Sequence, residues 1–126
     1  MRHLSIIFIL SILFGHTVKA QTYQSLWITG SAVPEGTRML QKTPDGDFRF
    51  AGALKDGELR IMTAEKPGDG TKYIAPAYED SYIVNKGTGT VLTADADKAS
   101  WVVPFAEDRY RFRVSADGKM LTGELF

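Results

Sequence analysis

Residues 109–126 read RYRFRVSADGKMLTGELF and close the sequence. In the first half of this stretch three apolar residues alternate with three arginines, which predicts a β-strand with one apolar and one cationic face. Asp117-Gly118 follows and is typical of a type I′ turn, which needs φ > 0 at both central positions. The stretch therefore predicts an antiparallel β-hairpin.

The turn also predicts the register of this hairpin. With Asp117-Gly118 as the loop, Val114 lies opposite Leu121 on the apolar face, and Arg111 lies opposite Glu124 on the other face. The cationic face carries Arg109, Arg111 and Arg113. It can be a solvated outer face or a surface for an acidic partner, and we favour the solvated face because carboxylates lie opposite the arginines.

From Leu26 onward the chain repeats this pattern, with short apolar segments separated by Gly, Pro and Asp. Asp56-Gly57 predicts a second hairpin with Leu54 opposite Leu59. Other strands are expected at 26–29, 48–50, 81–85, 88–93 and 100–103, with a long irregular stretch at 65–78 and a loop or one helical turn at 94–99. About eight short strands at such spacing predict an all-β sandwich or barrel.

Residues 1–20 have the features of a secretory signal peptide. A short cationic start precedes the apolar run 4–14, and Val18-Lys19-Ala20 has small residues at the positions that signal peptidase reads. The run is too short for a membrane anchor. No cysteine follows it, so no lipid anchor is expected. We expect an exported protein, periplasmic or secreted, with association with the outer membrane left open, and no transmembrane segment in the mature chain 21–126.

The composition of residues 21–126 restricts the function. These 106 residues suit a single domain, and they carry 13 basic and 15 acidic residues, a balance that argues against nucleic acid as a partner. Both histidines lie in residues 1–20, and the chain has no cysteine. This excludes Ser-His-Asp and Cys-His catalysis, zinc sites of the usual ligands, and haem ligation by His or Cys. No cofactor and no metal is expected.

Several pairs of carboxylates occur close together in the sequence. A glycosidase would need two such groups with one pKa raised by burial, and a calcium loop would need further oxygen ligands at fixed spacing. All of the pairs lie in polar, turn-like segments, so solvated turn residues are the better interpretation. The pairs are Asp45/Asp47, Glu79/Asp80, Asp95/Asp97 and Glu107/Asp108.

The aromatic residues are the candidates for ligand contacts. Sugars stack their C–H faces on flat rings, and nearby polar side chains bind the hydroxyl groups. Trp101 is expected in the core, whereas Tyr73 and Tyr78 fall in the irregular stretch, with exposure and burial equally expected. The aromatics considered are Trp27, Tyr73, Tyr78, Tyr82, Trp101 and Tyr110.

The order of several motifs resembles the repeat units of SusE/SusF-type starch-binding proteins. In that family an aromatic strand of the form L-Y-I-V-G-D-A-x-P opens each unit, a G-x-F-K-F strand follows, and a Y-R-I-x-V hairpin closes it. The matching segments here are LWITGSAVP (26–34), FRFAGAL (48–54), GELRIM (57–62) and YRFRV (110–114) with KML (119–121). Gly36-Thr37-Arg38 stands where the family has a stacking tryptophan.

The resemblance implies an immunoglobulin-like antiparallel β-sandwich over residues 21–126. It also implies a carbohydrate-binding module without catalysis, which would bind a starch-type oligosaccharide and work with other components of a glycan-uptake system. Trp27, Tyr73 and Tyr78 are the expected stacking residues, and Arg60 takes the position of the family's basic sugar-contacting residue. The alternative is a structural or adhesive module that pairs with a protein through a sheet edge. A small hydrolase ranks third.

Overall fold

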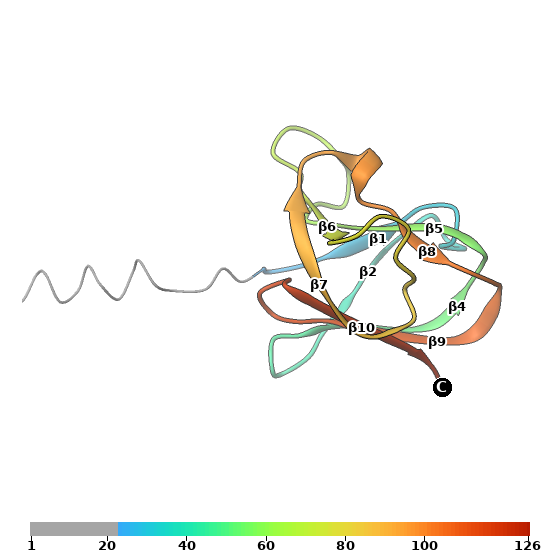
Figure 1. The fold of residues 1–126 in the computed structure, drawn as a ribbon. Helices are drawn as coiled ribbons and strands as arrows, with labels where there is room; N and C mark the ends of the chain where they lie inside the picture. Colours follow the sequence, from blue (N-terminus) through green and yellow to red (C-terminus); the bar gives the residue numbers. More distant parts are fainter. Residues whose placement is uncertain (1–22) are drawn as a thin grey trace, which may run out of the picture.

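The computed structural model describes residues 23–126, so the expected signal peptide 1–20 lies outside the described residues. This part of the chain is all-β and antiparallel, as the sequence predicts, with one short 3₁₀-helix, η1 (Ala96–Lys98) (Figure 1). Its ten strands are β1 (Trp27–Thr29), β2 (Thr37–Met39), β3 (Gln41–Lys42), β4 (Phe48–Leu54), β5 (Gly57–Met62), β6 (Tyr73–Pro76), β7 (Asn85–Thr93), β8 (Trp101–Val103), β9 (Glu107–Val114) and β10 (Met120–Leu125). No helix among residues 23–126 is long and apolar enough to span a membrane.

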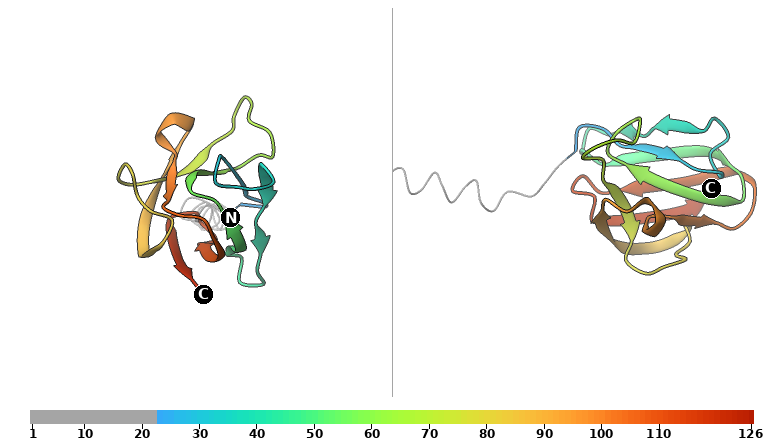
Figure 2. Two further views of the ribbon diagram at one scale, coloured as in Figure 1. Left: turned by 90° about the vertical axis from the view of Figure 1, so that its right-hand side faces the viewer. Right: turned by 90° about the horizontal axis from the view of Figure 1, so that it is seen from above.

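The sheet bends round until its two ends almost meet. Its strand order is β2-β1-β5-β6-β7-β10-β9-β4-β3, with β8 paired to β5. The terminal strands β2 and β3 are separated only by Leu40, whose N–H donates to the carbonyl of Leu26 at 2.9 Å. The result is nearly barrel-shaped (Figure 2). On the opposite side β7 turns the corner, because Asn85–Gly89 pair with β10 and Thr90–Thr93 pair with β6.

Strict alternation in β4 and β9 builds the core. Phe48 and Phe50 point inward from β4, Phe112 and Val114 point inward from β9, and the rings of Phe50 and Phe112 stack with centroids 5.3 Å apart. Burial of each such ring stabilises the fold by about 1.5–3 kcal/mol. Trp101 is fully buried, as expected, and its Nε1–H donates to the carbonyl of Ile74 at 2.9 Å.

The C-terminal hairpin has the predicted register but another turn. Val114 pairs with Leu121 and Arg111 pairs with Glu124. The prediction of a type I′ turn is wrong. Such a turn needs a positive φ at both Asp117 and Gly118, and only Gly118 has one, at 74°. Instead the N–H of Gly118 donates to the carbonyl of Ser115 at 2.8 Å, which makes Ser115–Gly118 the turn. Gly118 alone supplies the left-handed residue, where a side chain would be strained.

The predicted second hairpin at Asp56-Gly57 is wrong. β4 pairs with β9 and β3, whereas β5 pairs with β1, β6 and β8. The chain crosses here from one part of the sheet to another. The loop after β1 lies beside this crossing, because the N–H of Lys55 donates to the carbonyl of Ala32 and the N–H of Ala32 donates to the carbonyl of Glu58. Leu54 and Leu59 are both buried, but β4 and β5, on which they lie, do not pair with each other. The loop after β1 therefore fills the place of the predicted pairing.

Other boundaries also differ from the expected ones. Residues 85–93 form one strand, β7, where two strands around Lys86-Gly87 were expected. β6 lies inside the stretch expected to be irregular, and β2 and β3 lie where no period was visible. The helical turn η1 falls within the expected 94–99 segment.

Candidate functional site

Three of the four predicted contact residues come together on one outer face. Ile28, Ile61 and Ile74 point into the main core, so the alternate residues of β1, β5 and β6 point outward. Trp27 pairs with Met62 and Met62 pairs with Tyr73, which sets these side chains in one row. A second apolar cluster forms here from Met62, Tyr73, Ala75 and Ala99, with Trp27 and Ala96 packed against it. We call this the covered face.

The 3₁₀-helix η1 closes the covered face, and Arg60 holds it there. Arg60 Nε donates to the carbonyl of Ala96 at 2.8 Å, and its Nη2 lies 3.4 Å from Glu58 Oε1. Tyr73 is only 6% exposed, so neither side of its ring is free to stack on a ligand. Arg60 and Tyr73 therefore serve packing, while Trp27 stays half-buried.

Tyr78 lies elsewhere, in the loop 77–84 between β6 and β7, which we call the tyrosine loop. Its side chain is 77% exposed, and Tyr82 in the same loop is 57% exposed. Tyr82 was one of the aromatics considered but not one of the four predicted contact residues, and residues 81–85 were expected to form a strand. The signal that could have found it is the polar run Glu79-Asp80-Ser81 directly before it, which is typical of a turn.

Hydrogen bonds brace the tyrosine loop at both ends. Ser81 Oγ donates to the carbonyl of Tyr78 at 2.7 Å, and Asn85 Nδ2 donates to that of Tyr82 at 3.0 Å. Backbone bonds from Ile83 to Val102 and from Val102 to Ser81, each 2.9 Å, tie the loop to β8. Asp80 has φ 60° and turns the chain between the two tyrosines.

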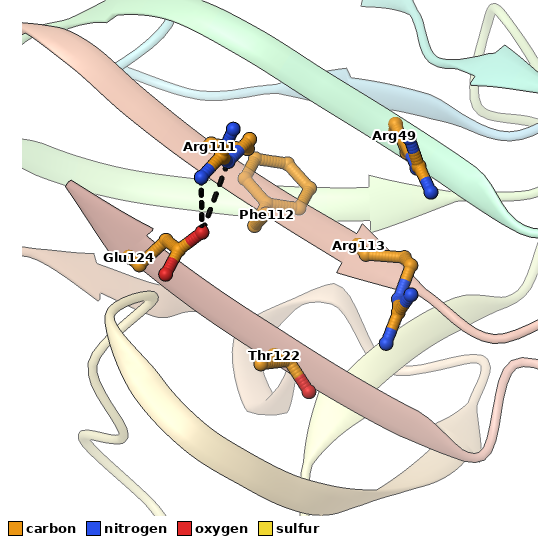
Figure 3. A pocket seen from close by; sticks show the side chains of 6 residues that line it. All are labelled: Arg49, Arg111, Phe112, Arg113, Thr122 and Glu124. Carbon is orange, nitrogen blue, oxygen red and sulfur yellow. Dashed lines mark hydrogen bonds and ion pairs between the residues drawn. The ribbon is translucent and has the colours of Figure 1, made fainter. Parts of the chain in front are cut away.

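A second exposed feature is a depression over β4, β9 and β10. It has a volume of about 330 Å³ and is lined by Arg49, Arg111, Phe112, Arg113, Thr122 and Glu124 (Figure 3). Glu124 Oε2 accepts from Arg111 Nε at 3.0 Å and from Arg111 Nη2 at 2.5 Å. The guanidinium of Arg111 also lies 4.9 Å from the centroid of the Phe126 ring. We call this surface the arginine face.

The carboxylate pairs serve turns and caps. Asp95 Oδ1 accepts from the N–H of Asp97 at 2.9 Å and caps η1. The N–H of Asp108 donates to Glu107, which lowers the pKa of Glu107, and Arg109 beside it acts in the same direction. A general acid needs the opposite shift. Within the described part of the chain, no three His, Cys, Asp or Glu side chains are grouped so that they could hold a metal ion.

Comparisons of the chain with protein-family models, with curated proteins and with solved structures found no significant match.

Proposed function

We propose that this protein is a non-catalytic glycan-binding module, and that the tyrosine loop is its contact surface. The observation that carries the proposal is the exposure of Tyr78 and Tyr82, two large rings held on one hydrogen-bonded loop. A sugar ring covers apolar area on such a side chain while the phenol group stays in contact with water and hydroxyls.

The bracing of the loop supports binding for an energetic reason. Ordering a flexible side chain on binding costs about 0.5–1.5 kcal/mol, and a loop that is already held avoids part of that cost. The bonds to β8 and from Asn85 fix the backbone on both sides of Tyr82. Trp27 keeps a partly exposed ring and stays a secondary candidate contact.

The finer parts of this proposal come from the resemblance to SusE/SusF-type proteins. They are an immunoglobulin-like sandwich as the detailed fold, a starch-type oligosaccharide as the ligand, and a place in a glycan-uptake system of the periplasm or outer membrane. Export through residues 1–20 belongs to the same proposal. Pairing through a sheet edge has less support, because the terminal strands β2 and β3 have only 3 and 2 residues.

Isothermal titration of the protein against a panel of soluble glucans tests the proposal. Tyr78→Ala and Tyr82→Ala should each weaken the binding of the best glucan about 5-fold to 30-fold, as expected for the loss of one stacking contact of about 1–2 kcal/mol. Tyr78→Phe and Tyr82→Phe are matched controls that keep the ring and should bind nearly as the native protein does. Titrations without heat across the whole panel, or alanine variants that bind normally, would overturn it.

A further inference from the structure

A row of hydrogen-bond donors crosses four strands on the arginine face. Gln41 of β3 pairs with Arg49 of β4, Arg49 pairs with Arg113 of β9, and Arg113 pairs with Thr122 of β10. The core fixes this row, because Phe48, Phe50, Phe112 and Val114 must point inward and their neighbours must then point outward. Two arginines from strands far apart in the sequence are thereby set directly opposite each other.

Opposed like charges on a sheet are unfavourable, and little in the structure offsets this pair. Arg113 Nε lies 3.7 Å from Asp47 Oδ2, which is too far for a hydrogen bond. Arg49 has no ion-pair partner among residues 23–126. Glu124 is already bound by Arg111 in the next row. The guanidinium of Arg49 is therefore available to a ligand, and that of Arg113 keeps donor groups beside its long ion pair with Asp47.

The charge of this surface contrasts with that of the whole chain. Residues 23–126 carry 13 basic and 15 acidic side chains, yet three arginines and one glutamate line the depression. The depression lies between the side chains of Arg49, Arg111 and Arg113. Figure 3 shows the Arg113 side chain extending toward Thr122, with Arg49 on the neighbouring strand. The site combines excess positive charge, donors from several strands and room.

We propose that Arg49, Arg113 and Thr122 form a binding site for an oxyanion group such as a sulfate. Guanidinium groups bind planar pairs of oxygens through two parallel N–H bonds, and a hydroxyl can add a third donor. The volume of about 330 Å³ is several times the ~30 Å³ of one water molecule, so the depression can hold the oxyanion together with part of a carrier such as a sugar ring. The site does not use the tyrosine loop, so it is independent of the proposed function.

Titrations with inorganic sulfate, dextran sulfate and unsulfated dextran at low ionic strength test this site. Arg49→Gln and Arg113→Gln should each weaken the binding of both sulfated ligands about 10-fold, as expected for the loss of a charge-assisted contact. Arg109→Gln is the matched control, because it removes the same charge from the same strand outside the depression and should change binding less than about 2-fold. Arg49→Lys should bind almost as weakly as Arg49→Gln, since lysine keeps the charge but loses the paired bonds.

The pattern of results separates the source of the oxyanion. Much tighter binding of dextran sulfate than of inorganic sulfate identifies an ester on a glycan, and similar affinity per sulfate identifies the free ion. If neither sulfated ligand binds, or if Arg109→Gln weakens binding as much as Arg49→Gln, the proposal is wrong. Binding of unsulfated dextran concerns the tyrosine loop and should be unchanged in Arg49→Gln, so failure of one proposal leaves the other measurable.

Discussion

The covered face and the arginine face are the two outer sides of the same curved sheet, and they differ in what lies on them. On the covered face η1 packs over Met62 and Tyr73, and Arg60 is bound to the backbone of that helix. On the arginine face no segment of residues 23–126 closes the depression, and Arg49 projects into it. Arginines thus occur on both faces, but Arg60 is bound to the backbone of η1, whereas Arg49 has no ion-pair partner among residues 23–126.

This difference teaches that residue type alone does not identify a binding surface. Trp27, Arg60 and Tyr73 have the chemistry of a sugar site, and the fold does bring them together. A three-residue helix turns their surroundings into a second small core. What remains for ligands is the residues that no other segment covers.

Tyr73→Ala has the largest effect expected from this comparison. Removing the ring of a side chain that is 6% exposed should lower the free energy of unfolding by about 3–4 kcal/mol, because it leaves a cavity under η1. Urea denaturation measures this value. Tyr78→Ala is the matched control, since Tyr78 is 77% exposed and loss of its ring should change stability by less than about 0.5 kcal/mol. Equal losses in both variants would contradict the assignment of the two tyrosines to different roles.

Arg60→Met tests the closure of the covered face with a side chain of similar length. The loss of the bond to Ala96 should lower the free energy of unfolding by about 1–2 kcal/mol. It should also speed hydrogen exchange at the amide of Ala99, which donates to Ala96 within η1. Arg111→Met on the arginine face removes a solvent-exposed ion pair, so a change below about 1 kcal/mol is expected. Unchanged exchange in Arg60→Met would mean that η1 is held by packing alone.

Asp117→Asn gives the smallest effect and tests the turn that joins β9 and β10 under the arginine face. The hydroxyl of Ser115 and the N–H of Lys119 lower the pKa of Asp117 below its ordinary value of 3.8. A lowered pKa adds stability that is complete above that ordinary value and is lost as pH falls through the folded-state pKa. The variant should thus be less stable than the native protein near pH 6, by under about 1 kcal/mol because solvent still reaches the half-buried Asp117, and equally stable near pH 2. A difference that stays constant with pH would contradict this origin.

The sequence predicts the C-terminal hairpin well because two independent signals agree there. Alternation over β9 and the length of the turn both require Val114 opposite Leu121. At Asp56-Gly57 the turn signal was local and nothing fixed the partner strand, so the pairing of β4 with β9 overrode it. β2 and β3 escaped notice because their 3 and 2 residues are exposed and show no period.

The candidate surfaces were predictable only in part. For Tyr78 the sequence left exposure and burial equally expected, and the residue is exposed. The burial of Tyr73 depends on η1, which packs on it from more than twenty positions later in the sequence. The cationic side of residues 109–113 was visible as alternation. The contribution of Arg49 was not, because its place beside Arg113 requires the pairing of two strands that no turn connects.

The register between β7 and β10 shifts after Leu121, and Gly123 sits at that shift. A methyl group at position 123 would collide with the backbone carbonyl of Ile83, which follows Tyr82. Replacement of this glycine would consequently displace the segment that carries both exposed tyrosines. The substitution lies on β10, so neither phenol group is altered. Gly123→Ala is therefore expected to weaken the proposed glycan binding without changing either tyrosine, and a survey of tolerated mutations should show few substitutions at this position.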